Sequence, residues 1–292
     1  MIKSIISKAV AVAAMSLGAA SAANAFVISA GDVKISVDNY DMGNIGYGFT
    51  PGAVCTNDPD ACDAVSQGAN GLGIFDTGGI FSVSTISSIS TGEVLFTKGV
   101  NGYLTGVFGG LREQTVVNTF DPFLNSLTTT ALSVGGFVNL YLNDADWDPT
   151  LITTNPGVDL VAGVYPGITG GTLYLSADFA AGGAYAGSPT TTYTSKFDTS
   201  TTSGVGSGYL DVTGGLAFDT FNTNTQIGKN GGKHDLFLTV TYDDEGGSAS
   251  SIGWTVTSAG QIKGNAIPEP GALALIALGM IGAGAATTRR KG

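Results

Sequence analysis

Glycine content and an alternating pattern of apolar side chains constrain the fold of this chain more than any other feature. The 292 residues include 45 glycines, and a glycine inside a helix lowers its stability by roughly 1 kcal/mol. Apolar and polar residues alternate, with the period of a half-buried strand, at 33–37, 80–84, 137–142, 173–179, 236–242 and 253–257. Turn residues bound these runs, as in β-sandwich domains. We therefore predict an all-β fold, an antiparallel β-sandwich.

The N-terminus has the three parts of a secretory signal peptide. Two lysines precede an apolar stretch at residues 9–20, and Ala23 and Ala25 form an A-x-A cleavage site. A retained membrane anchor is the alternative, but the apolar stretch is short for a membrane span. We predict that the export translocon and signal peptidase act on residues 1–25.

The C-terminus combines a rigid break with an apolar stretch. Pro268 and Pro270 lack an N–H, so neither a helix nor a central strand continues through them, and Glu269 between them stays in water. Residues 271–288 carry no charge. Eighteen residues of helix reach about 27 Å, enough for a thin bilayer. We predict a single transmembrane helix at 271–288.

Three basic residues, Arg289, Arg290 and Lys291, follow this stretch. The positive-inside rule keeps such a cluster cytoplasmic, which leaves the rest of the chain outside. An ordinary buried C-terminal helix is the alternative. A helix of that kind shows a polar face, and this apolar stretch has none.

The order of Pro268-Glu269-Pro270, an apolar helix and a basic end resembles the PEP-CTERM sorting signal of Gram-negative bacteria. Tails of that family are recognised by exosortases, which are membrane transpeptidase-like proteases. The resemblance implies that residues 267–292 are a sorting signal and that an exosortase is a partner. Residues 26–266 are then a β-rich extracellular domain, found at the cell surface or in the extracellular matrix.

A second stretch resembles flocculation-associated PEP-CTERM proteins. It comprises the glycine-rich run 206–215, the segment 235–238 and Trp254. Proteins of that group are exported and help floc-forming bacteria to aggregate with their exopolysaccharide. The resemblance implies a role in biofilm or floc formation, with exopolysaccharide as a partner.

The mature chain is strongly acidic. Without the leader and tail, seven of the 12 basic residues and 22 of the 23 acidic residues remain, for a net charge of −15. This charge excludes nucleic acid and anionic membrane surfaces as partners, because their phosphates would be repelled. It suits calcium, neutral or amine-bearing sugars, or simple solubility outside a cell.

Cys55 and Cys62 are the two cysteines of the chain. In an exported protein such a pair is typically bonded, so we predict a structural disulfide. A two-cysteine metal site would need two more soft ligands, and the chain has one histidine. Three nearby aspartates could hold a cation, or could simply form a solvated turn.

Two other acidic runs and a polar stretch have weaker interpretations. Residues 143–148 place oxygen side chains at alternating positions, like half of a calcium loop, but the turn glycine and the downstream glutamate are missing. Alternatively this run ends a strand, with Trp147 packed and the carboxylates in water. Residues 243–247 suggest a hairpin turn. The Thr/Ser-rich stretch 190–203 predicts a long surface loop or linker.

Motifs of catalysis are missing from the sequence. His234 is the one histidine, and no Gly-x-Ser-x-Gly elbow, H-E-x-x-H pair or phosphate-binding loop occurs. We therefore predict a non-enzymatic matrix or surface protein without catalytic residues, metal or cofactor. The alternative is a secreted carbohydrate-binding or carbohydrate-active module that uses the same export route.

Overall fold

The computed structural model describes residues 28, 31–43, 52–55, 77–148, 165–198, 203–243, 254 and 256–267. This part of the chain is almost entirely strand, with one short helix, α4 (Phe218–Phe221). The strands are β1 (Gly31–Gly43), β2 (Gly52–Cys55), β3 (Thr77–Ser88), β4 (Val94–Thr97), β5 (Tyr103–Asp121), β6 (Ser126–Asn143), β7 (Thr172–Phe179), β8 (Tyr193–Asp198), β9 (Gly204–Gly214), β10 (Gln226–Ile227), β11 (Lys233–His234), β12 (Leu236–Asp243) and β13 (Val256–Ala266).

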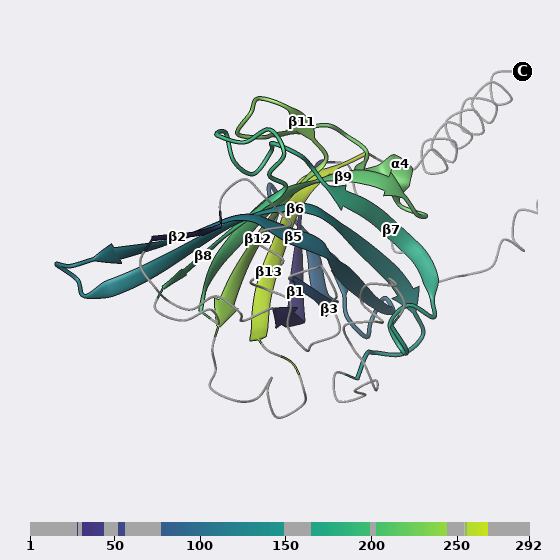
Figure 1. Ribbon diagram of the computed structural model, residues 1–292. Coiled ribbons are helices and arrows are strands. Elements are labelled where there is room, and N and C mark those ends of the chain that lie inside the picture. Colours follow the sequence, from purple (N-terminus) through teal and green to yellow (C-terminus); the bar gives the residue numbers. More distant parts are fainter. Residues whose placement is uncertain are drawn as a thin grey trace, which may run out of the picture.

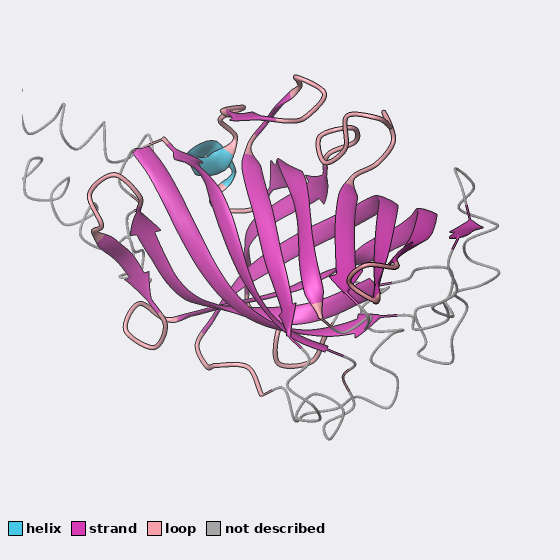
Figure 2. Cartoon of the chain, turned by 90° about the vertical axis from the view of Figure 1, so that its left-hand side faces the viewer, coloured by secondary structure: helices cyan, strands magenta, loops and turns pink. Residues whose placement is uncertain are grey.

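The strands form an antiparallel sheet that closes into a barrel, and the prediction of a β-sandwich is therefore wrong. The order around the barrel is β5-β3-β1-β13-β12-β9-β7-β6, and β6 pairs back with β5. Figures 1 and 2 show the strands wrapping around a common interior. Alternation predicts one buried face in either architecture. Closure depends on long-range pairs, β1 with β13 above all, which alternation does not specify.

One place in the barrel wall is shared by two short strands. β7 pairs with β6 and β9 toward one end of the barrel, and β8 pairs with the same two strands toward the other end. Residues 180–192 leave the wall between them. The predicted loop at 190–203 is therefore wrong in part, because β8 lies within it. The high threonine and serine content of this segment indicated a loop, although Tyr193 and Ser195 are buried.

Beyond Gly110 and Gly135, β5 and β6 continue as a long hairpin, which we call the arm and which is seen at the left of Figure 1. β8 pairs with β6 along the part of this hairpin nearest the barrel. Gly110 and Gly135 have φ values of +75° and +72° at the bend between barrel and arm, a conformation that favours glycine. β2 pairs with β5 along the arm. At the tip, the side chains of Phe123 and Leu124 are 95% and 76% exposed.

The barrel interior is packed with apolar side chains at the end where β1 begins, which we call the closed end. Ile35, Leu210 and Leu236 are almost fully buried there. Phe221 of α4 belongs to the same cluster and has no exposed surface. The helix therefore seals the closed end of the barrel.

A second apolar cluster covers part of the outer wall. Ile80 and Val107 point outward from β3 and β5, and Tyr165, Ile168 and Trp254 pack over them. Trp147 contributes from the end of β6, with its ring 5.5 Å from that of Tyr40. These layers explain why strand residues on both faces of β3 are buried.

The alternating runs predicted five of these strands correctly, namely β1, β3, β6, β7 and β12. The sixth run, 253–257, overlaps only the beginning of β13, which continues to Ala266. None of the helices in the described residues is long and apolar enough to cross a membrane. The predicted signal peptide at 1–25 and the predicted helix at 271–288 lie outside the described residues.

Candidate functional site

The inward face of β1 changes from apolar to polar along a single strand. Val33, Ile35 and Val37 point into the barrel core, and continued alternation brings Asn39 and Asp41 to the same face. Both polar side chains are buried, with 6% and 4% of their surface exposed. They lie at the end of the barrel opposite α4, which we call the mouth.

Asp41 is held by two hydrogen bonds. The Asn39 Nδ2 donates to Asp41 Oδ1 at 2.5 Å, and the Ser258 hydroxyl of β13 donates to Asp41 Oδ2 at 3.0 Å. The Oδ1 atom of Asn39 is buried and has no hydrogen-bond partner among the residues that the structure describes. Because a buried acceptor without a partner costs about 1–3 kcal/mol, this atom requires an explanation.

Burial raises the pKa of Asp41 from 3.8 to about 7, although the hydrogen bonds from Ser258 and Asn39 favour the charged form. Removal of the carboxylate from water therefore outweighs both hydrogen bonds. At neutral pH this side chain exists in both protonation states, which is unusual for an aspartate.

Two tyrosines complete the polar group at the mouth. The hydroxyl of Tyr193, from β8, is hydrogen-bonded to the hydroxyl of Tyr242, from β12. Burial raises the pKa of both hydroxyls, and the charge of Asp41 raises each further. The ring of Tyr242 stacks on Phe197 at a centroid distance of 5.4 Å. Both phenols therefore remain neutral hydrogen-bonding groups.

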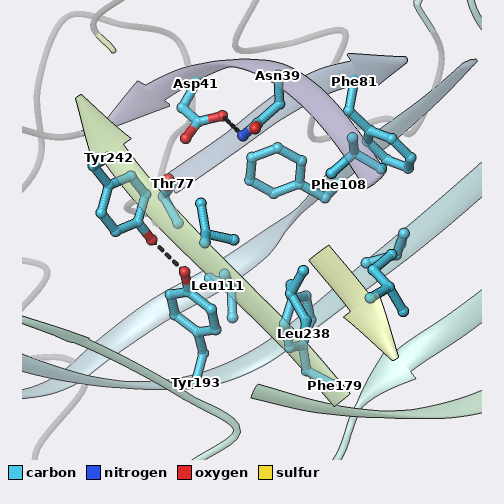
Figure 3. A pocket seen from close by; sticks show the side chains of 14 residues that line it. Asn39, Asp41, Thr77, Phe81, Phe108, Leu111, Phe179, Tyr193, Leu238 and Tyr242 are labelled. Atoms are coloured by element: carbon cyan, nitrogen blue, oxygen red, sulfur yellow. Dashed lines mark hydrogen bonds between the residues drawn. The ribbon is translucent and has the colours of Figure 1, made fainter. Parts of the chain in front are cut away.

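A cavity of about 50 Å³ lies between these polar groups and the apolar core. Figure 3 shows Asn39, Asp41, Tyr193 and Tyr242 around it, together with apolar side chains of several strands. The apolar part of its lining includes Phe81, Phe108, Phe179, Leu238 and Ile262. The mouth is thus an apolar hollow with a small set of converging polar atoms, the usual composition of a small-molecule site.

Glycines on the inner face of the wall leave space for two aromatic rings. A Cβ at Gly106 would lie 2.3 Å from the Phe81 ring, and a Cβ at Gly79 would lie 2.6 Å from the Phe108 ring. Larger residues at these two positions would displace the rings. The glycine content that excluded helices therefore also shapes the interior.

The acidic run at 143–148 matches the alternative interpretation, a strand end with packed Trp147. β6 ends at Asn143, whose side-chain amide donates to Thr105 Oγ1 at 2.7 Å. Asp146 is exposed and pairs with Lys98 at 2.9 Å. Within the described residues, no group of three His, Cys, Asp or Glu side chains lies close enough to hold a metal ion.

His234 is buried and paired with Asp211 at 3.0 Å through Nδ1. Its Nε2 atom has no hydrogen-bond partner among the described residues, so the two residues form a pair without a serine nucleophile. The neighbouring Asp235 accepts hydrogen bonds from the backbone N–H groups of Val212, Thr223 and Asn224. This part of the molecule has the features of a structural support for the loops near α4.

Cys55 is the one predicted site residue that the structure describes, and it is buried against Val116 and Ala131 of the arm. The disulfide with Cys62 stays a prediction. The other predicted site residues lie outside the described residues, namely Cys62, Ala23, Ala25, Pro268, Glu269, Pro270, Arg289, Arg290 and Lys291.

Sequence reasoning missed the polar group at the mouth. Its signal was present for Asn39 and Asp41, since they continue the period-2 pattern of Val33 to Val37 and so belong to the buried face. Tyr193 was missed because its strand was interpreted as a loop. Tyr242 lies in a predicted strand, but its position opposite Tyr193 depends on barrel closure.

Comparison with known proteins identifies the C-terminal segment. Residues 266–291 match the PEP-CTERM protein-sorting motif. The chain is therefore a PEP-CTERM domain-containing protein, and the predicted resemblance is confirmed. The motif marks it as an extracellular protein of Gram-negative bacteria that is exported and sorted to the surface by an exosortase. No curated protein and no solved structure matches the chain.

Proposed function

We propose that the barrel is a non-enzymatic component of the extracellular matrix, delivered by a removable tail and acting with exopolysaccharide in biofilm or floc formation. The observation that carries this proposal is the position of the sorting motif. The matched segment begins at Ala266, which is the last residue of the last strand, β13. The sorting motif and the fold therefore share a single residue, Ala266.

The contacts at this junction support removal of the tail. Ala266 pairs with Gly31 of β1, and the N–H of Ile267 donates to the carbonyl of Thr220 at 2.8 Å. Processing at Pro268-Glu269-Pro270 would leave both contacts in place. The released barrel would keep every strand pair of its wall.

The non-enzymatic part of the proposal is supported by the carboxylates of the cavity. Glycoside hydrolysis needs two facing carboxyl groups about 5–9 Å apart. Asp41 is the one acidic residue among the described residues that line the cavity. The alternative function is that of a carbohydrate-binding module. A measurement of direct sugar binding by the barrel distinguishes this alternative from the matrix role.

The mass of the C-terminal peptide of the mature protein tests whether the tail is removed during export. We expect extracellular protein to end near Pro268-Glu269-Pro270, whereas a variant with all three residues replaced by alanine should keep Arg289-Arg290-Lys291 and stay in the inner membrane. Unprocessed wild-type protein in the inner membrane would show a plain anchor and contradict the proposal.

The matrix role requires a separate test in the producing bacterium. Deletion of the protein should weaken aggregation and lower the amount of polymer retained by the cells, and reintroduction should restore both. Normal aggregates with unchanged polymer retention would contradict the role. Strong, saturable binding of the purified barrel to one defined sugar would favour the carbohydrate-binding alternative instead.

A further inference from the structure

We propose that the barrel mouth binds the protonated form of a short primary alkylamine. The alkyl chain lies among the apolar side chains of the cavity, and the ammonium group lies between Asp41 and Asn39. This inference does not depend on the matrix role, because it rests on the cavity alone. Three independent features of the cavity support it.

The first feature is an acceptor that lacks a donor. Asn39 Oδ1 is buried at the cavity, while the Nδ2 atom of the same side chain is already used by Asp41. A partner must therefore donate a hydrogen bond. An ammonium group has three donors and no acceptor, so it can serve Asn39 Oδ1 and Asp41 together.

The second feature is a carboxylate without a cation. No lysine or arginine is among the described residues that line the cavity. The charge of Glu113, which raises the pKa of Tyr242, is also negative. A buried carboxylate is stable when it is paired, and a cationic ligand supplies the missing charge.

The third feature is the combination of aromatic rings and limited volume. Phe81, Phe108, Tyr193 and Tyr242 line the same hollow, and aromatic faces attract cations within about 6 Å. At about 10–15 Å³ for each water-sized group, the volume of about 50 Å³ has room for roughly three to five non-hydrogen atoms. The ligand is therefore a primary amine with a short, unbranched chain of roughly two to four carbons.

The affinity for such an amine depends on pH. The groups that face Asp41 are Asn39 on its own strand, Ser258 on β13 and the tyrosine pair, Tyr193 on β8 with Tyr242 on β12. Both tyrosine pKa values are raised above 10, so the carboxyl group is the one that changes charge near neutrality. Binding should strengthen as pH rises through about 7.

Calorimetric titration of the purified exported protein tests the proposal with three four-carbon probes that differ in their head group, n-butylamine, 1-butanol and butyrate. At pH 8 we expect butylamine to bind at least tenfold more tightly than butanol and butyrate not to bind. At pH 5.5 the affinity for butylamine should fall at least tenfold. Ring signals of Tyr193 and Tyr242 in NMR spectra should shift on binding.

Matched variants separate binding from folding. Asp41→Asn should lower the affinity for butylamine to that for butanol and remove the pH dependence, with butanol binding unchanged. Asp38→Asn makes the same charge change on the exposed face of β1 and should leave butylamine affinity unchanged within twofold. Equal binding of butylamine and butanol by the wild type would overturn the proposal. Preference for butyrate, or no binding by any probe, would overturn it as well.

Discussion

The two ends of the barrel interior share most of their strands, with β7 completing the wall at the closed end and β8 at the mouth, but they differ in their chemistry. At the closed end, Ile35, Leu236 and Phe221 fill the interior and are almost fully buried. At the mouth, Asn39 and Asp41 occupy equivalent inward positions beside a cavity. The switch occurs within β1, over a few residues and without a change in backbone alternation. Along this continuous strand, the choice of side chains therefore separates a stabilising end from a ligand-sized hollow.

The largest predicted effect is on the free energy of unfolding. It comes from truncating one aromatic side chain at each end of the barrel and comparing the two losses. Phe221→Ala should lower the free energy of unfolding by about 3–5 kcal/mol, because the side chain has no exposed surface and seals the barrel. Phe81→Ala should cost at least about 1 kcal/mol less, because water can enter the cavity that it already lines. Denaturant titration measures both, and equal losses would remove the distinction between the ends.

The second prediction concerns the pH dependence of stability that Asp41 contributes at the mouth. The pKa of Asp41 is raised above its unfolded value of 3.8 to about 7, so the folded state holds this proton more tightly. The resulting stability is present below pH 3.8 and is lost as pH rises through 7.

Asp41→Asn tests this dependence, since an amide can still accept from Asn39 and donate to Ser258. Between pH 4 and pH 8, the wild type should lose about 2–4 kcal/mol more stability than the variant. Parallel pH profiles of the two proteins would show that Asp41 is not perturbed. Asp38→Asn serves as the exposed control.

Two glycines on β13 allow the same substitution at each end. A Cβ at Gly264 would lie 2.4 Å from Leu236 Cδ2 and 3.1 Å from the carbonyl of Asp235, whereas at Gly260 it would lie 2.7 Å from Val37 Cγ2. Val37 lines the cavity and has space to move. We expect Gly264→Ala to cost about 2–3 kcal/mol and Gly260→Ala about 1 kcal/mol. The reverse order in thermal or denaturant unfolding would contradict the assignment of the hollow end.

The smallest effect is expected on the arm, outside the barrel. Phe123→Ser at the exposed tip should change the free energy of unfolding by less than about 0.5 kcal/mol, because 95% of the side chain is exposed. Val116→Ala on β5, at the base of the same arm, is the control, since Val116 is fully buried with Cys55. A large loss from Phe123→Ser would mean that the tip packs against another part of the protein.

The sequence was sufficient to predict strands but not their closure. Alternation in runs such as 236–242 reports one buried face, and that face is the same whether strands meet in a sandwich or around a barrel. The pairing of β1 with β13 joins residues more than 200 positions apart. Such pairs depend on the register of every strand between them, which local patterns do not encode.

The candidate site was predictable only in part, for a similar reason. Asn39 and Asp41 could have been placed on the buried face of β1 by continuing its alternation. Their partners come from distant strands: Ser258 from β13, Tyr193 from β8 and Tyr242 from β12. The sorting tail shows the opposite case, since its order of proline break, apolar stretch and basic end is local and was identified from sequence.

The register of β1 with β13 determines at which rim of the barrel the sorting motif begins. Gly31 lies opposite Ala266, so the first residue of β1 and the first residue of the matched motif lie at the same rim. Ile267 is the only residue between the last strand and Pro268. The matched motif therefore begins at the rim that α4 seals, and Asp41 lies toward the opposite end of β1.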